Sequence, residues 1–322
     1  MLMSVLCKKE DFIIQIPDLN FLNALIGQGI DKNNDGNISS FEAETVNNIY
    51  IRNMNISDIS GIEAFVNLNY FWCSSNQISN LNVSMNSSLL HLDCSNNLLS
   101  NLDLSSNTKL THLICSNNHL TDLDISNNTA LIKLTCTSNQ LTSLDFSKNI
   151  LLKEINCNLN QLLSLNLLNQ TALINLSCGN NLIESLDVSN NKALEILLCG
   201  SNKLTSLDLS KNTALSSLIC NRNQLTSLNL TNNALIIFID CSSNQLTNLN
   251  IADNTALYWL KGYNNKLSSL DISKNTALNN LNIKDMPSLG KICVWELPFP
   301  PSGFSIDTIN CPNIYFSTDC SK

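Results

Sequence analysis

Charged residues are scarce in this chain: they make up 14% of its 322 residues, against about a quarter in an average soluble protein. The 18 basic side chains form no stripe, and with 26 acidic ones they leave a net charge of -8. Nucleic acids and anionic membranes are recognised by clustered positive charge, so neither is expected as a partner. No apolar run reaches the roughly 18 residues that a membrane-spanning helix needs, so no transmembrane segment is expected.

A fixed spacing of 21 residues organises most of the chain. Nine cysteines follow one another at this interval: Cys73, Cys94, Cys115, Cys136, Cys157, Cys178, Cys199, Cys220 and Cys241. Leu113 and Cys115 alternate with polar or exposed neighbours as in a β-strand, and Leu123 and Ile125 do so half a turn later. The pattern predicts a β-rich solenoid of about eleven turns of 21 residues, with two short strands on opposite walls of each turn.

Two columns of asparagine mark the corners of the predicted turns. The first is Asn76, Asn97, Asn118, Asn139, Asn160, Asn181, Asn202, Asn223, Asn244 and Asn265. The second is Asn86, Asn107, Asn128, Asn149, Asn191, Asn212, Asn233, Asn254 and Asn275. Asparagine amides can satisfy backbone groups that a bend leaves unpaired. Gln170 replaces asparagine in the second column, where the segment LLNQT lies one residue off the pattern.

The nine spaced cysteines are expected to be reduced thiols inside the solenoid. Nine is an odd number, and stacked side chains run parallel at the strand spacing, which is wider than the distance of about 3.8 Å that disulfide Cβ atoms need. A buried thiol behaves as a small apolar side chain.

The unit L-x-x-L-x-C-x-x-N-x-L, as in the segment from Leu110 to Leu120, resembles the leucine-rich repeats. Its second half, L-D-L-S-x-N-T-A-L, resembles the short repeats of surface and secreted proteins of Bacteroidetes. The segment ISDISGIEAFVNL, ending at Leu68, is similar to the first repeat of internalin-like proteins. The resemblance implies a right-handed leucine-rich-repeat coil that acts as a non-enzymatic binding module, secreted or on the cell surface.

We expect three parts: a leader and helical N-terminal cap at 1–48, the solenoid at 49–285, and an irregular C-terminal cap at 286–322. Pro17 and Asp18 precede leucines at helical spacing, which predicts a helix start. The apolar start before Cys7 is too short for a complete signal peptide. It is either the remnant of a signal peptide truncated in this chain or a disordered leader.

Three cysteines lie outside the repeat near the end of the chain, where prolines interrupt the pattern: Cys293, Cys311 and Cys320. In an exported protein, two of the three are expected to form a disulfide and one to stay a thiol. We favour Cys293 with Cys320, which would join the two ends of the C-terminal cap.

The segment DKNNDGNISSFE in the N-terminal cap matches an EF-hand-like calcium loop. The expected calcium ligands are Asp31, Asn33, Asp35, Asn37, Ser39 and Glu42. Gly36 permits the sharp turn, and Glu42 would give both carboxylate oxygens. The alternative is a polar loop that matches by chance.

We expect a protein or glycan to bind on the concave face, towards the C-terminal half. The outward positions beside the inward leucine and cysteine become apolar and aromatic there: Ile196, Leu198, Ile219, Phe238, Trp259, Lys261 and Tyr263. A soluble protein seldom exposes a contiguous apolar strip without a use for it. The alternatives are self-association, packing of the C-terminal cap on this strip, and a structural or adhesive spacer with no specific ligand. Tyr70 and Trp72 form a smaller rival patch.

Catalytic motifs are missing from the sequence. It has no nucleophile elbow, P-loop, dinucleotide-binding loop or zincin motif. His91 and His112 share one repeat position and, with Asp93, offer at most a weak zinc site without a clear third strong ligand. The alternative is two exposed polar residues on the binding face. The acidic column that includes Asp103 and Asp124 obeys the repeat, as a solvated face would, so no enzyme is expected.

Overall fold

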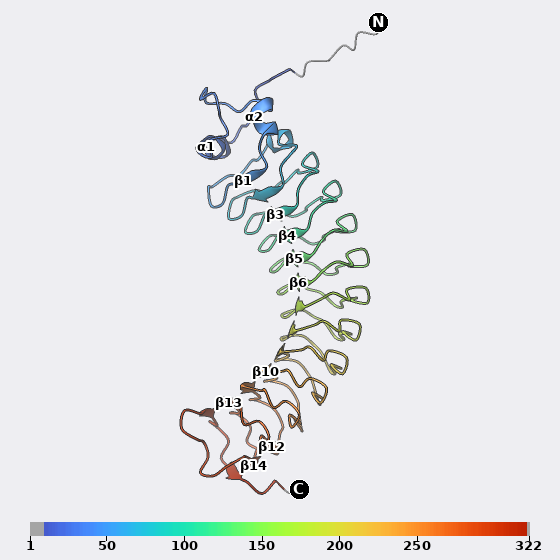
Figure 1. The fold of residues 1–322 in the computed structure, drawn as a ribbon, viewed down its shortest axis with the longest axis vertical. Helices are drawn as coiled ribbons and strands as arrows, with labels where there is room; N and C mark the ends of the chain where they lie inside the picture. Colours follow the sequence, from blue (N-terminus) through green and yellow to red (C-terminus); the bar gives the residue numbers. More distant parts are fainter. Residues whose placement is uncertain (1–9, 321–322) are drawn as a thin grey trace. The chain divides into compact units, whose positions relative to one another are not determined.

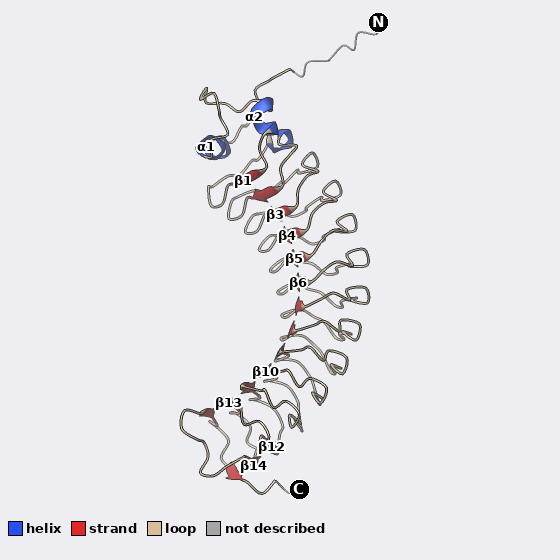
Figure 2. Ribbon diagram, in the orientation of Figure 1, coloured by secondary structure: helices blue, strands red, loops and turns tan. Residues whose placement is uncertain are grey.

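The computed structural model describes residues 10–320 and divides the chain into two compact units, Met1–Leu131 and Ile132–Lys322. Each unit is a stack of chain turns, and in most turns one short parallel strand is formed on the same wall (Figures 1 and 2). The expected leucine-rich-repeat solenoid is confirmed. Thirteen turns have a strand on this wall, close to the eleven expected. The N-terminal leader discussed above lies outside the described residues.

Unit 1 begins with the helical cap. Its helices are α1, Leu19–Gly27, and α2, Ser40–Glu44, followed in the first turns by the 3-10 helix η1, Ile62–Ala64. The Asp18 side chain accepts hydrogen bonds from the amides of Asn20 and Phe21, so the predicted helix start is confirmed. Its strands are β1 (Asn48–Tyr50), β2 (Tyr70–Trp72), β3 (His91–Asp93) and β4 (His112–Ile114).

Unit 2 continues the repeat. Its first-wall strands are β5 (Lys133–Thr135), β6 (Glu154–Asn156), β7 (Asn175–Ser177), β8 (Ile196–Leu198), β9 (Ser217–Ile219), β10 (Phe238–Asp240), β11 (Trp259–Lys261), β13 (Asn280–Asn282) and β15 (Ser305–Asp307). All are paired in parallel in this order. No helix in the described part of the chain is long and apolar enough to cross a membrane.

The core of each turn is filled by the inward leucines and cysteines. In the turn of β6, Leu152, Ile155, Cys157 and Leu162 are at most 1% exposed. The nine spaced cysteines are buried thiols, as predicted. Burial raises the pKa of the Cys157, Cys199 and Cys241 thiols to about 12, because a thiolate is poorly solvated in an apolar interior.

A second strand in every turn was expected on the opposite wall, and this prediction is wrong for most of the chain. Within residues 10–320, the only sheet there is formed by β12 (Ser269–Asp271), β14 (Lys291–Cys293) and β16 (Tyr315–Ser317). In the other turns side chains satisfy the backbone instead. The carboxylate of Asp103, for example, accepts the amide of Ser105. Such local bonds compete with strand pairing.

The two asparagine columns are hydrogen-bonded ladders. Asn97 donates from Nδ2 to the carbonyls of Cys73, at 3.0 Å, and Cys94, at 3.1 Å, and its Oδ1 accepts the Ile78 amide. Asn107, in the second column, donates to the carbonyls of Val83 and Asn86, both in the turn before its own. Each ladder residue therefore ties its own turn to the one before it.

Gln170 takes the place of asparagine in the second column, as the sequence indicates, but its turn is not one residue off the pattern. It is buried in the second column, and its Nε2 donates to the carbonyls of Phe146, at 2.7 Å, and Asn149, at 3.5 Å. The turn stays in register because glutamine reaches the same carbonyls with one more methylene.

The end of the chain is more regular than expected. Instead of an irregular cap, β14, β15 and β16 extend both walls. Trp295, Phe299, Phe304 and Phe316 pack together over them, with ring centroids 4.9 to 6.0 Å apart. These aromatic residues close the open end of the stack, which the repeat leucines cannot do.

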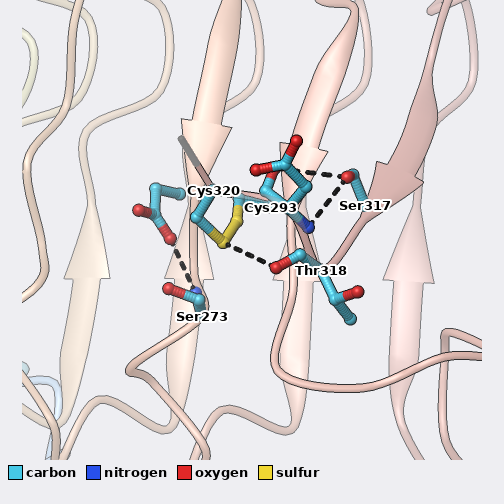
Figure 3. Close-up of a disulfide and its surroundings, with 7 residues drawn as sticks. Ser273, Cys293, Ser317, Thr318 and Cys320 are labelled. Atoms are coloured by element: carbon cyan, nitrogen blue, oxygen red, sulfur yellow. Dashed lines mark hydrogen bonds between the residues drawn. A yellow bond between two sulfur atoms is a disulfide. The ribbon is translucent and has the colours of Figure 1, made fainter. Parts of the chain in front are cut away.

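The pairing favoured from the sequence is confirmed: Cys293 and Cys320 form a disulfide, with their Cα atoms 5.6 Å apart (Figure 3). It fixes the segment after β16 to β14. Cys320 Sγ also lies 3.6 Å from the carbonyl oxygen of Thr318. Cys311 remains a buried thiol.

Candidate binding surfaces

The outward residues of neighbouring strands form columns, because the strands pair without any shift from turn to turn. In unit 2 one column is Ile196, Ser217, Phe238 and Trp259, and the next is Leu198, Ile219, Asp240 and Lys261. A ligand that lies along these strands would therefore meet one residue of each column per turn.

All seven residues predicted to bind a partner lie on this side of unit 2. Six are outward residues of β8 to β11, and Tyr263 follows β11 by two residues. They do not form one continuous apolar strip, however. Ser217 interrupts the first column and Asp240 the second, because apolar residues on successive turns fall into different columns.

The most exposed part of this surface is an aromatic patch, which we define as Ile237, Phe238, Tyr258, Trp259 and Lys261. Ile237 is 52% exposed, Tyr258 51% and Trp259 39%. The rings of Phe238 and Trp259 meet edge to face, with centroids 5.7 Å apart. The patch thus offers a pre-packed apolar surface to a partner.

Ile237 and Tyr258 were missed in the sequence analysis. Strict alternation predicts that one outward residue precedes the inward residue of the strand. In these two turns, however, two consecutive residues before the inward residue face outward. Both residues precede the strand, next to Phe238 and Trp259. The sequence could have indicated both residues, because this position of the repeat is apolar or aromatic in both turns.

Lys261 lies against the two rings of the aromatic patch. Its Nζ is 5.2 Å from the centroid of Trp259 and 5.7 Å from that of Phe238. A cation at this distance from a ring face gains about 0.5–1 kcal/mol at an exposed site. The lysine stem therefore extends the apolar surface, while its charge stays at the edge of the patch.

Unit 1 has a different outward surface, a ring ladder formed by Tyr50, Tyr70, Trp72, His91 and His112. The centroids of His91 and His112 lie 4.1 Å apart with the rings nearly parallel, and those of Tyr70 and His91 lie 4.6 Å apart. Tyr50 and Trp72 meet edge to face at 4.9 Å. The rival patch of the sequence analysis is therefore larger than Tyr70 and Trp72 alone.

The histidine pair does not gather the third zinc ligand considered from the sequence. The Asp93 carboxylate is buried, forms an ion pair with Arg52 and accepts the Ser95 hydroxyl at 2.6 Å. Burial, and then the neighbouring His112, lower the pKa of His91. In residues 10–320, Asp271 groups with Cys293 and Cys320 at metal-ligand distances, but these two cysteines form the disulfide.

The EF-hand-like loop folds around its first aspartate. Asp31 is buried, and its carboxylate accepts the backbone amides of Asn34 at 2.7 Å, Asp35 at 3.3 Å and Gly36 at 3.0 Å. Gly36 has a φ of 80°, which suits glycine. The sharp turn expected from the sequence is present.

Glu42 closes the loop from its other end. Its carboxylate accepts the amides of Lys32 at 2.6 Å and Ser39 at 2.9 Å, and the Ser39 hydroxyl accepts the Glu42 amide. Burial acts to raise the pKa of Glu42, but these hydrogen bonds outweigh it and lower the pKa. Ser39 is thus the cap of α2.

The remaining expected ligands lie in the same loop. Asn33 donates from Nδ2 to Asp35 Oδ2 at 2.9 Å, and the Asn37 amide donates to Asp35 Oδ1 at 2.8 Å. The Asn37 and Asn33 hydrogen bonds lower the pKa of Asp35. Carboxylate and amide oxygens are the ligands that calcium prefers.

No family model matches the chain, and a search of curated proteins finds no match. Among solved structures, the chain is similar to the functional domain of InlJ from Listeria monocytogenes, which includes a cysteine ladder. The two are 34% identical, with a TM-score of 0.81, over 85% of this chain and 65% of that one. The chain therefore spans just under two thirds of that domain.

Two further structures share the fold at lower identity. The internalin InlF of Listeria monocytogenes is 20% identical, with a TM-score of 0.72, over 95% of this chain and 96% of that one. A leucine-rich-repeat protein of Leptospira interrogans is 21% identical, with a TM-score of 0.69, over 86% and 79%. The chain is a leucine-rich-repeat solenoid whose structural neighbours are internalin-type proteins.

Proposed function

We propose that this chain is a non-enzymatic binding module that acts outside the cell and takes up a protein partner on the outward side of unit 2. The observation that carries the proposal is the aromatic patch, where Ile237 and Tyr258 are more than half exposed beside the packed pair of Phe238 and Trp259. Aromatic residues in such surroundings are the usual anchors of interfaces. A spacer without a ligand would not need them.

An extracellular location is supported by the Cys293–Cys320 disulfide. Disulfides form and persist in oxidising environments and are rare in the cytosol of mesophiles. The likeness to internalin-type proteins points the same way, through the surface or secreted location that the resemblance implies.

The proposal is tested with Phe238→Ala/Trp259→Ala in parallel with the wild type on arrays of purified extracellular protein domains and of glycans. Tyr70→Ala/Trp72→Ala is the matched control, because it also removes two outward rings. We expect the first variant to weaken a detected protein complex at least thirtyfold and the control to change it less than threefold. Affinity unchanged within threefold in the first variant would exclude the patch.

Two other results would redirect the proposal. Loss of dimerisation alone in Phe238→Ala/Trp259→Ala would make a second copy of this chain the partner. A glycan hit that needs Trp259, without any protein hit, would replace the protein by a sugar. Melting temperatures within 2 °C of the wild type are required of both variants, since the replaced side chains lie outside the core.

We also propose that the loop Asp31–Glu42 binds one calcium ion and so orders the N-terminal cap. The support is that hydrogen bonds hold Asp31, Asn33, Asp35 and Glu42 within this one loop. Calorimetry with millimolar calcium should show one site that Asp31→Asn abolishes, with magnesium as the control ion. If calcium gives no binding heat and a chelator leaves the melting temperature unchanged, the loop is not a calcium site.

A further inference from the structure

Beside the aromatic patch, unit 2 has a shallow hollow of about 290 Å³ on the outward side of strands β7 to β9. It is bounded by the ends of these strands and the turns that follow them. Its apolar wall is formed by Leu198 and Ile219, which are neighbours in the strand register. Both were assigned to partner binding from the sequence, but they belong to this hollow and not to the aromatic patch.

Two glycines open the hollow. Gly179 and Gly200 follow the cysteines of their turns, at a position where the two flanking turns have Asn158 and Asn221. A Cβ atom on Gly179 would lie 3.0 Å from the Gly200 carbonyl oxygen, and one on Gly200 would lie 2.0 Å from Oδ1 of Asn221. Side chains at these two positions would therefore crowd the space that the hollow occupies.

The asparagines at its two ends are held in place. Asn158 Oδ1 accepts the Gly179 amide at 2.6 Å, and Asn221 Nδ2 donates to Asp240 at 3.3 Å. The Asp240 carboxylate is buried and also accepts the amide and hydroxyl of Ser242. Asp240 does not line the hollow.

Arg222 supplies the positive charge of the hollow. It is one of only two arginines in the chain, and the other, Arg52, forms an ion pair with Asp93. Within residues 10–320 the Arg222 guanidinium has no ion-pair or hydrogen-bond partner, and Arg222 lines the hollow. The charge is therefore available to a ligand.

The backbone of Arg222 is unusual for an arginine. Its φ is 51°, in the left-handed region, as at the same position of the other turns. In unit 2 those turns have the residues Ser138, Leu159, Asn180, Ser201, Ser243, Asn264 and Asp285 there. Left-handed backbone is tolerated best by glycine and asparagine, so arginine here has a conformational cost that the repeat does not require.

From these observations we infer that the hollow is a subsite for one acidic side chain, glutamate or aspartate, of the protein partner. Arg222 pairs with the carboxylate, for which a guanidinium has matching geometry. Leu198 and Ile219 contact the methylene part of the side chain, and Asn158, whose Oδ1 accepts the Gly179 amide, can offer its Nδ2 to the polar end. The inference rests on the proposed protein partner, and it gives that partner an acidic residue next to its apolar anchor.

The test uses the whole chain with 13C-labelled isoleucine and leucine methyl groups. The probe is N-acetyl-glutamate amide, and its neutral counterpart is N-acetyl-glutamine amide. We expect saturable shifts of the Leu198 and Ile219 methyl signals with the glutamate probe and at least tenfold weaker binding of the glutamine probe. Arg222→Gln should weaken the glutamate probe at least tenfold, Arg222→Lys should keep part of the binding, and Lys192→Gln, which removes an exposed cation elsewhere in unit 2, should have no effect.

Equal response to both probes, or binding unchanged in Arg222→Gln, would overturn the inference. Binding of glucuronate without binding of the glutamate probe would also overturn it, in favour of an acidic sugar. The response should persist in Phe238→Ala/Trp259→Ala, which separates the two proposals. If the hollow does not bind the glutamate probe, the aromatic patch remains the proposed docking site. If the patch does not bind the partner, the glutamate probe should still bind in the hollow.

Discussion

The inward and outward positions of the same strands differ in how much their residues vary from turn to turn. Inward positions repeat almost unchanged, as at Cys157, Cys178 and Cys199, all fully buried. Outward positions change from turn to turn, from the stacked His91 and His112 of unit 1 to the Phe238 and Trp259 pair of unit 2. The stack restricts the first set because each inward side chain must fit its copies in the neighbouring turns. The second set is not restricted in this way.

The largest effect expected from this difference is loss of stability at high pH. Eight of the spaced thiols have a raised pKa in the folded protein, because they are buried. Above pH 9 the unfolded chain loses these protons while the folded chain keeps them, so the free energy of unfolding falls as the pH rises. Each thiol contributes about 1.4 kcal/mol per pH unit.

Urea midpoints measured under reducing conditions between pH 8 and pH 10.5 check this expectation. The midpoint should be steady below pH 9 and fall steeply above it. Replacing Cys157, Cys178, Cys199 and Cys220 by alanine should flatten the slope by about half. A midpoint that does not depend on pH would show that water reaches the inward thiols more than the structure implies.

A single buried ladder residue should give the next largest effect. Asn191 is fully buried and donates to the carbonyls of Leu167, at 3.1 Å, and Gln170, at 2.8 Å. Asn191→Ala leaves these two acceptors without the amide and should cost about 2–4 kcal/mol in the free energy of unfolding. Asn190→Ala is the matched control, because Asn190 is exposed. Equal effects of the two substitutions in urea unfolding would remove the distinction between inward and outward positions.

The smallest effect is expected on the outward side, at His91. Its lowered pKa means that the unfolded chain takes up a proton near pH 6.5 before the folded chain does, so stability should fall as the pH drops from 7 to 5. Solvent screening limits the loss to less than about 1 kcal/mol. Thermal melting of the wild type and His91→Gln at both pH values checks it. A loss of the same size in His91→Gln would assign the effect to other groups.

Most of the solenoid could be predicted because the repeat constrains it many times over. One turn does not identify Cys157 as inward, but nine cysteines at one spacing do. The same reasoning failed where side chains, and not a second sheet, satisfy the hydrogen-bonding groups of the backbone. The second-wall strands were expected from alternation at Leu123 and Ile125, but there the asparagine ladder and the aspartate turns satisfy the backbone groups that a sheet would pair.

The candidate binding residues were predictable only in part. Phe238, Trp259 and Lys261 follow from alternation, and the structure brings them together. The outward direction of Ile237 and Tyr258 depends on the path of the chain just before the strand, which an alternation with a period of two does not specify. The hollow beside Arg222 was not anticipated, because two glycines and one arginine of different turns have meaning only when the turns are stacked.

The sequence alone favoured the Cys293–Cys320 pairing among three without deciding it, and it determined the period and the inward columns. These depend on burial and spacing, which are local or repeated properties of a chain. Only the tertiary structure decided which outward residues are neighbours. It separated Leu198 from the aromatic patch, engaged Asp93 with Arg52, and left Arg222 beside Gly200 without a partner in the described residues. The physical reason is that neighbours on this surface are about 21 residues apart in the chain, so contact depends on the register of the strands and on the side-chain directions that it fixes.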